Sequence, residues 1–322
     1  MPKSSEMSPL NPMVFVVGCP RSGTTLLQRM LDAHPDLAVA NDTHFITRAA
    51  KRELRHDANP LLDDALVERV LSYHRFHRMG LERRDALRAA RGAKTYADFV
   101  SRLYDLRARQ AGKTLSGEKT PDYCRKMPLL HRLFPFARFL HIIRDGRDVA
   151  LSTLDWASGN KGPGRWDLWP KDAVGACALW WRWQVGSGNY DGARLGPSVY
   201  REVRYEDLVG QPETELAAIC DFLGLPFDER MPRFHEGKTR DAPGRSAKSA
   251  WLGPVAGLRD WREQMCAADA AVFDAIAGDL LDSTGYGRES YAASTNVSER
   301  VLECMAWWSD RGRDVKGVMK TG

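Results

Sequence analysis

The sequence lacks the features that mark several common classes of protein. Its six cysteines are never closer than 38 residues apart, so no C-x-x-C pair is present for a zinc or redox site. No stretch approaches the roughly 18 uninterrupted apolar residues of a membrane-spanning helix, and the first residues lack the apolar run of a signal peptide. No His, Cys and Asp cluster at metal-ligand spacing occurs either. These absences predict a cytoplasmic protein with reduced thiols, no membrane span and no metal.

An excess of charge of one sign is also missing. The chain of 322 residues has 47 Lys and Arg against 42 Asp and Glu, a net charge of +5. That excess is too small and too dispersed for a protein dedicated to nucleic acid, but it suits a small anionic ligand. With 43% hydrophobic residues, the chain can bury the core of one large domain or two modest ones.

The sequence does contain an alternation of strand and helix patterns. Three short runs rich in apolar and β-branched residues predict strands at residues 13–17, 138–144 and 199–205. Helical spacing is found at residues 25–31, 127–133, from about 148, and at 212–223. Residues 45–110 predict two or three amphipathic helices, and residues 115–121 a short connection. A strand–helix order of this kind predicts a parallel sheet.

Six tryptophans lie between residues 154 and 183. The segment from Trp156 to Trp169, which includes a glycine-rich loop, suggests an aromatic-lined pocket for a phenol or a sugar ring. The other three, Trp180, Trp181 and Trp183, fall in a helical pattern, where core packing is the favoured interpretation.

The first strand and helix flank a candidate phosphate-binding loop. Residues 18–25, GCPRSGTT, have the frame G-x-x-x-x-G-K-[ST] of a P-loop. Free backbone N–H groups and the positive end of the helix dipole stabilise an anion there, and Arg21, Ser22, Thr24 and Thr25 add donors. Because Thr24 stands where the P-loop lysine belongs, the loop fits a monophosphate-sized group better than a nucleoside triphosphate.

A second anion site is predicted where the strand at residues 138–144 ends. Arg144 leaves the carboxyl end of that strand, and Ser152 lies in the first or second turn of the next helix. Both can face the crevice in which open α/β sheets bind ligands. Asp145, one residue late for a magnesium ligand, is the best feature of the alternative, a P-loop nucleotide or small-molecule kinase. A non-catalytic anion-binding protein is a third interpretation.

Together the two motifs PRSGTT and RDGRDVALS, about 120 residues apart, resemble the phosphate signatures of sulfotransferases that use 3′-phosphoadenosine 5′-phosphosulfate (PAPS). The sequence is most similar to the protein-tyrosine sulfotransferase branch and its bacterial relatives. Further segments carry the resemblance in the same order and spacing, namely residues 21–48, 117–121, 133–135 and 203–209. The resemblance implies a P-loop-containing three-layer α/β/α fold with a central, mostly parallel sheet and helical insertions. We expect one such domain at residues 13–308, after a disordered leader at 1–12 and before a polar, basic tail at 309–322.

The resemblance also implies roles for single residues. It implies that the 5′-phosphosulfate end of the donor is bound by Arg21, Ser22, Gly23, Thr24 and Thr25, and the 3′-phosphate by Arg144 and Ser152. Tyr205 matches a family tyrosine that touches the nucleotide. Many members carry a late lysine or arginine that closes over the 3′-phosphate; Arg245 or Lys248 is our candidate.

The catalytic residues implied by the resemblance are Asp42, Lys119 and Arg21. Asp42 stands where the tyrosine-sulfating branch has a glutamate base, and because its side chain is one methylene shorter, His44 is the alternative base. Lys119 and Arg21 would stabilise the leaving phosphate without a metal. As purely structural alternatives, Asp42 caps a helix and Lys119 is a solvated loop lysine. The acceptor hydroxyl could belong to a small molecule, a glycan, a lipid or a peptide.

Overall fold

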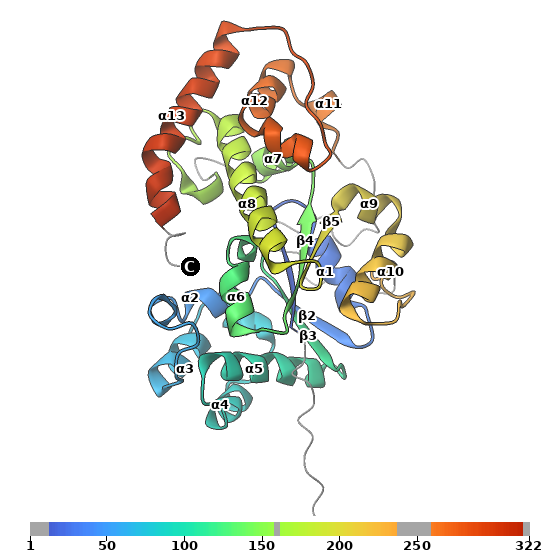
Figure 1. Cartoon of the computed structure of the whole chain (residues 1–322). Helices are drawn as coiled ribbons and strands as arrows, with labels where there is room; N and C mark the ends of the chain where they lie inside the picture. Colours follow the sequence, from blue (N-terminus) through green and yellow to red (C-terminus); the bar gives the residue numbers. More distant parts are fainter. Residues whose placement is uncertain (1–12, 158–161, 237–258, 318–322) are drawn as a thin grey trace, which may run out of the picture.

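In the computed structural model, residues 13–157, 162–236 and 259–317 are described. The predicted leader at 1–12 and the candidate cations Arg245 and Lys248 lie outside these residues. Five strands form one sheet, in which every strand runs parallel to its neighbours in the order β2-β3-β1-β4-β5 (Figure 1). The strands are β1 (Val14–Gly18), β2 (Leu37–Asn41), β3 (Leu115–Lys119), β4 (Arg138–Ile143) and β5 (Tyr200–Arg204).

The sequence analysis predicted three of these strands and missed β2 and β3. The prediction of a connection at residues 115–121 was wrong, because LSGEK forms the inner strand β3 between β1 and β2. Its polar side chains are buried, and the carboxylate of Glu118 is satisfied by side-chain and backbone donors rather than by water. Gly117 is needed there, since a Cβ would lie only 2.8 Å from the carbonyl oxygen of Val14 on the neighbouring strand.

Helices cover both faces of the sheet, which confirms the three-layer α/β/α prediction. On one face, α1 (Thr24–Asp32), α9 (Tyr205–Gly210) and α10 (Pro212–Leu223) bury Val14, Val16, Leu140 and Ile142. On the other, α5 (Tyr96–Gln110) and α6 (Met127–Leu133) pack with Phe15, Val17 and Phe139. The alternation of buried residues along β1 and β4 therefore places apolar side chains on both faces, as expected for a parallel sheet.

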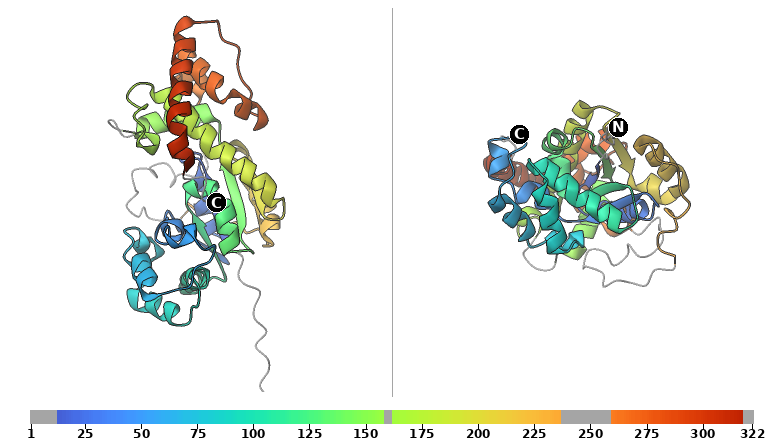
Figure 2. Two further views of the ribbon diagram at one scale, coloured as in Figure 1. Left: turned by 60° about the vertical axis from the view of Figure 1, so that its left-hand side comes forward. Right: turned by 90° about the horizontal axis from the view of Figure 1, so that it is seen from below.

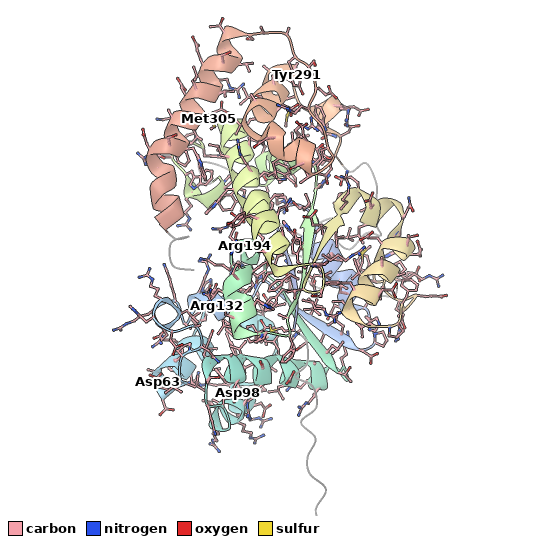
Figure 3. The ribbon with its side chains drawn as sticks, viewed as in Figure 1. Asp63, Asp98, Arg132, Arg194, Tyr291 and Met305 are labelled. Carbon is pink, nitrogen blue, oxygen red and sulfur yellow. The ribbon has the colours of Figure 1, made fainter. Side chains whose placement is uncertain are left out.

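The segment between β2 and β3 is a helical insertion. It contains four α-helices rather than the two or three predicted: α2 (Phe45–Arg48), α3 (Asp64–Leu71), α4 (Arg83–Arg91) and α5. Two of these begin at side-chain caps, because Asp63 accepts a hydrogen bond from the Leu66 N–H and Thr95 accepts one from the Asp98 N–H. Figure 3 labels Asp63 and Asp98 at this end of the molecule, and the left view of Figure 2 shows the insertion below the lower end of the C-terminal helix.

A second helical group packs beyond the carboxyl ends of the strands. It consists of α7 (Gly146–Trp156), α8 (Ala173–Leu195), α11 (Trp261–Gln264), α12 (Ala267–Ser283) and α13 (Thr295–Gly317). Trp181 is fully buried in this group, and Trp180 and Trp183 pack against its core, as predicted. The predicted division of the chain at residue 308 falls inside α13.

The hypothesis of an aromatic pocket between Trp156 and Trp169 is wrong for two of its tryptophans. Trp166 and Trp169 are buried in the core of the second helical group. The Trp166 ring lies 5.0 Å from the Trp307 ring and 5.4 Å from the Trp180 ring, centroid to centroid. These indoles fill the space between α8 and α13 and leave Trp156 as the exposed member.

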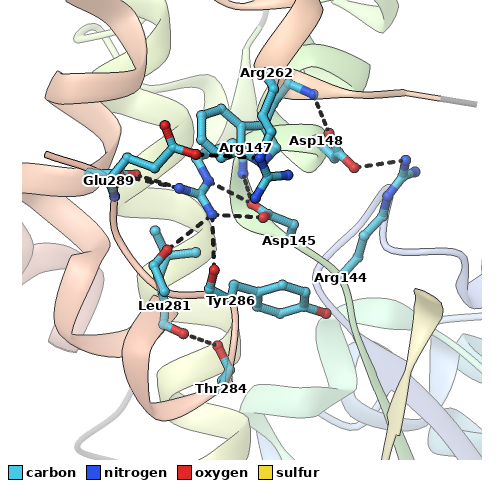
Figure 4. A network of polar contacts seen from close by, with 12 residues as sticks. Arg144, Asp145, Arg147, Asp148, Arg262, Leu281, Thr284, Tyr286 and Glu289 are labelled. Atoms are coloured by element: carbon cyan, nitrogen blue, oxygen red, sulfur yellow. Dashed lines mark hydrogen bonds and ion pairs between the residues drawn. The ribbon is translucent and has the colours of Figure 1, made fainter. Parts of the chain in front are cut away.

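Arg147 joins this helical group to the sheet through a buried ionic network (Figure 4). Its guanidinium lies 2.9 Å from Asp145 at the end of β4 and 3.2 Å from Asp274 on α12. It also donates to the Gly287 carbonyl oxygen and stacks over the Trp261 ring. The Arg147 side chain is fully buried, so the network fixes α11, α12 and the segment after α12 against the end of the sheet.

We predict that Arg147→Ala lowers the free energy of unfolding by about 3–5 kcal/mol, because Asp145 and Asp274 are then buried without their cation. Urea denaturation measures the loss. Arg182→Ala removes an exposed ion pair with Asp279 and is the matched control, expected to cost less than about 1 kcal/mol. An equal loss in the two variants would contradict the role of the network.

Candidate active site

The parallel register brings the predicted site residues to one edge of the sheet. Asn41 and Val16 flank Lys119 in the ladder, so the ends of β2 and β3 and the phosphate loop after β1 lie side by side. Gly18 pairs with Ile142, and Ile143 with Arg204, which places Arg144 and Tyr205 at the same edge. Every strand therefore contributes its carboxyl end, where open α/β sheets bind ligands.

The phosphate loop has the geometry of an anion cradle. Arg21 and Gly23 both adopt positive φ angles, 78° and 91°, and α1 begins directly after Gly23 with no side-chain cap on its first N–H groups. The Ser22 hydroxyl is buried without a hydrogen-bond partner among the described residues. Unfilled donors at the positive end of a nine-residue helix fit a bound phosphate or sulfate group.

Tyr205 closes one side of this loop. A Cβ on Gly23 would lie 2.4 Å from the ring of Tyr205, so only glycine allows the ring to pack against the loop. The Arg144 guanidinium stacks on the same ring at 4.3 Å. Tyr205 thus links the two predicted anion sites; its contact with the nucleotide stays a prediction.

Side chains of α7 contact the cations of the second site. Ser152 accepts a hydrogen bond of 3.1 Å from Arg21, and Asp148, one turn earlier, lies 3.4 Å from Arg144. The Nε of Arg144 is buried with no partner within the described part of the chain. Burial, and then the charges of Arg144 and Arg259, lower the pKa of Arg21. Several cations therefore crowd one partly buried spot, where an anion would relieve their repulsion.

Arg259, a late cation that was passed over in favour of Arg245 or Lys248, lies beside this site. It pairs with Asp155 on α7, one turn beyond Ser152, and its neighbour Trp261 donates its N–H to Asp148 at 3.0 Å. The segment before α11 is thereby fastened along the same helix face as Arg21 and Arg144. A late cation was expected, but the contact joins residues about 100 positions apart, which no local spacing reveals.

The predicted catalytic pair is formed. The Lys119 ammonium lies 3.1 Å from the Asp42 carboxylate and donates to the Thr25 hydroxyl of the phosphate loop at 3.2 Å. Lys119 is 1% exposed and its pKa is lowered by burial, while the Asp42 charge opposes that shift. It is therefore no solvated loop lysine. Asp42 also does not cap α2, because that position is taken by His44, whose side chain makes no capping bond.

His44 lies beside this pair but is poorly suited to hold a proton. Its Nε2 is 3.9 Å from the Asp42 carboxylate, and Arg78 approaches the other oxygen of Asp42 at 3.6 Å. Burial lowers the pKa of His44 to about 4, and the charge of Arg75 adds to the shift. His44 is thus neutral at pH 7, and the Asp42 carboxylate contacts both Lys119 and Arg78.

Glu118 is a residue that the sequence analysis missed. It is fully buried and accepts hydrogen bonds from the Thr43 N–H at 3.0 Å, the Tyr104 hydroxyl at 2.8 Å and the Thr120 hydroxyl. A glutamate beside the candidate lysine was visible in the sequence. Its burial was not, because residues 115–121 were interpreted as a connection.

Asp145, the best feature of the kinase alternative, is otherwise engaged. Its carboxylate accepts from the Arg147 N–H at the start of α7 and binds the Arg147 guanidinium with both oxygens. Among the described residues, no group of three or more His, Cys, Asp or Glu side chains is placed to hold a metal ion.

A basic depression of about 370 Å³ lies at the end of α2, the helix that begins after His44. Its lining consists of Arg48, Ala49, Lys51, Arg52, Arg55 and Arg69. Arg48 connects it to the site, since its guanidinium lies 3.9 Å from Asp122, a residue whose charge acts on His44. Arg69 is neutralised by Glu53, whereas no ion pair to Lys51, Arg52 or Arg55 is found within the described residues.

The pKa of His44 predicts an acid-labile fold. Because the folded protein holds His44 at a pKa of about 4 and the unfolded chain at about 6.5, the unfolded chain binds the proton more readily. Stability is therefore fully present above pH 6.5 and falls as the pH drops toward 4. We expect the wild type to lose about 2–3 kcal/mol more than His44→Gln between pH 7 and pH 4.5, measured by urea denaturation. Equal acid sensitivity of the two proteins would contradict this assignment; His141, also held neutral by burial, is common to both.

Comparison with known proteins agrees with this geometry. Residues 12–229, about two thirds of the chain, match the model of the sulfotransferase family. A protein-tyrosine sulfotransferase of Drosophila melanogaster is 26% identical over 326 residues, which cover 92% of this chain and 58% of that protein. Protein-tyrosine sulfotransferase 1 of Homo sapiens is 26% identical over 242 residues, 70% of this chain and 54% of that protein. The chain thus spans little more than half the length of these curated relatives.

Two solved structures share the fold. The sulfotransferase domain of the olefin synthase from Synechococcus PCC 7002 superposes with a TM-score of 0.50 at 24% identity, covering 94% of this chain and 96% of that one. The sulfotransferase domain from the curacin biosynthetic pathway gives 0.51 at 18% identity, covering 92% and 99%. These two structures show the fold alone. The match of residues 12–229 to the family model establishes that the chain belongs to the sulfotransferase family.

Proposed function

We propose that this protein transfers a sulfuryl group from PAPS to an acceptor hydroxyl. The observation that carries the proposal is the meeting of three features at one sheet edge: a phosphate loop with Thr24 in place of the lysine, the arginines that contact α7, and the pair Asp42–Lys119. The family match and the names of the curated relatives support it.

The chain's residues fit the donor nucleotide. In this proposal the backbone and side chains of Arg21–Thr25 bind the 5′-phosphosulfate, as the orphaned Ser22 hydroxyl suggests. Arg144 and Ser152 bind the 3′-phosphate, and Tyr205 lies against the nucleotide. We add Arg259 to this set, because it meets α7 next to Ser152.

Asp42 and Lys119 would have different roles in the reaction, Asp42 as the base and Lys119 as the cation that stabilises the leaving group. Asp42 takes the proton of the acceptor hydroxyl while the acceptor oxygen forms its bond to sulfur and the bond from sulfur to the bridging phosphate oxygen breaks. The products are the sulfate ester and 3′-phosphoadenosine 5′-phosphate (PAP). Lys119 contacts both the base Asp42 and Thr25 of the phosphate loop. Its positive charge would stabilise the leaving phosphate.

The acceptor we favour is a protein tyrosine next to acidic groups. The curated relatives are named protein-tyrosine sulfotransferases, and the basic depression at the end of α2 offers Lys51, Arg52 and Arg55 to an anionic acceptor. Glycans, lipids and small phenols are the competing acceptors. We also propose a cytoplasmic location, supported by six cysteines that form no disulfide. No helix among the described residues has the length and apolar character to cross a membrane.

Asp42→Ala should abolish most turnover, because a positioned base contributes about 10²- to 10⁴-fold. Transfer of labelled sulfate from PAPS to a panel of tyrosine peptides, glycans, lipids and phenols measures the effect. Binding of PAP by calorimetry should change less than about twofold, since Asp42 does not line the phosphate loop. The control is Asp98→Ala, at an exposed carboxylate in the helical insertion. Wild-type turnover in Asp42→Ala would rule out the proposed base.

The basic depression predicts a preference for acidic acceptors. The double variant Arg52→Gln, Arg55→Gln should raise KM for an acidic tyrosine peptide by about five- to tenfold, with kcat and PAP binding unchanged, because exposed charge contacts contribute modestly. Salt should reproduce the effect in the wild type. Arg84→Gln, Arg88→Gln on α4 is the matched control. Equal KM values for acidic and neutral peptides in the wild type would exclude this part of the proposal.

A further inference from the structure

Glu118 is a buried carboxylate with no part in the chemistry proposed above. Its side chain is 0% exposed, and both oxygens are occupied by donors from three elements. The Thr43 N–H and the Thr120 hydroxyl donate to Oε1, and the Tyr104 hydroxyl on α5 donates to Oε2. Each donor comes from a residue near the catalytic pair or from the insertion that supports it. A buried charge with this many partners is costly to build and is usually retained for a specific arrangement.

The backbone that Glu118 holds is strained. Asp42 and His44 adopt φ angles of 56° and 58°, a left-handed conformation that costs a residue other than glycine of order 1–3 kcal/mol. Such a conformation persists only where neighbouring contacts fix it. Thr43 lies between the two strained residues, and its N–H is bound by Glu118. The Asp42 N–H is bound by the Lys119 carbonyl oxygen at 2.6 Å. Two consecutive residues of β3 therefore fix the loop that carries Asp42.

Glu118 also contributes charge. Lys119 faces Asp42 from the loop after β2, Arg78 from the insertion and the Thr25 hydroxyl from the phosphate loop. Burial and Arg78 lower the pKa of Lys119, whereas Asp42 and Glu118 raise it. Glu118 itself faces Asp42 and the hydroxyls of Tyr104 and Tyr123. Burial raises the pKa of Glu118, and its three hydrogen-bond donors oppose that shift.

We propose that Glu118 is a positioning residue that holds the strained loop so that Asp42 meets Lys119. Because Glu118 precedes Lys119 in β3 and both side chains are buried, its negative charge also favours the protonated form of Lys119. The inference rests on the proposed function, because it assigns Glu118 a purpose only if Asp42 and Lys119 act as a pair.

Two variants separate geometry from charge. Glu118→Gln keeps the shape and can still accept from the Thr43 N–H, but it removes the charge. We expect kcat to fall about 10- to 100-fold while the Kd for PAP stays within about twofold, because small displacements of reacting groups are costly. The basic limb of the pH profile of kcat should move to lower pH, because Lys119 then loses its proton more easily. Tyr104→Phe removes the hydrogen bonds of the Tyr104 hydroxyl to Glu118 and to the Thr43 hydroxyl and keeps the charge, so kcat should fall without movement of that limb.

A readout without substrate accompanies the kinetics. In the ligand-free protein, ¹³C NMR of the lysine ε-carbons should show the Lys119 titration at lower pH in Glu118→Gln and unchanged in Tyr104→Phe. Glu68→Gln, an exposed glutamate on α3, is the matched control and should change neither kcat nor the titration. If Glu118→Gln does not fold, Thr120→Val, which removes another donor to the carboxylate, joins Tyr104→Phe in testing the positioning.

The outcomes distinguish the two proposals. Wild-type kcat and an unmoved Lys119 titration in Glu118→Gln, with Asp42→Ala inactive, would overturn the role of Glu118 and leave the proposed function intact. If the wild type transfers no sulfate, or if Asp42→Ala is as active as the wild type, the proposed function fails instead. A loss of kcat in Tyr104→Phe with the Lys119 titration displaced only in Glu118→Gln supports both parts of the inference.

Discussion

The parallel register of the five strands is the constraint on which the rest of the site depends. Since every strand runs in the same direction, the residues that follow β1 to β5 meet at one edge, although they are up to 180 or so positions apart in the sequence. A slip of the β3 register by one residue would exchange Glu118 and Lys119 between the faces of the sheet. The donor loop, the catalytic pair and the arginines that contact α7 would then no longer share one crevice.

Charge is arranged unequally around that edge. Arg147 is fully compensated by Asp145 and Asp274, and its network holds the second helical group in place. Arg144 and Arg21, by contrast, crowd together with a buried Nε left without a partner among the described residues. The first arrangement stabilises the fold, and the second would be completed by an anion in the proposed function. Two neighbouring arginines of one motif, Arg144 and Arg147, thus serve different purposes.

Much of the fold and of the donor site could be predicted from the sequence, because their signals are local. The phosphate loop lies within eight residues, and Arg144 and Ser152 are set by a strand end and the helix after it. Asp42 and Lys119 came from family resemblance, and the structure brings them together. Strand β3 was missed because its polar residues are satisfied by distant partners such as Thr43 and Tyr104. Arg259 was passed over because its partner, Asp155, is also distant in the sequence. The buried Trp166 and Trp169 show that composition alone does not distinguish a pocket from a core.

The most direct test of the central claim is calorimetric titration of the purified protein with PAP and, separately, with ATP, both in the presence of EDTA. We predict that PAP binds with about micromolar affinity and without metal, and that ATP does not bind, because Thr24 replaces the P-loop lysine and, in the proposed function, Arg21 and Arg144 beside α7 bind the phosphates of PAP. Binding of ATP that requires magnesium, with no binding of PAP, would contradict it.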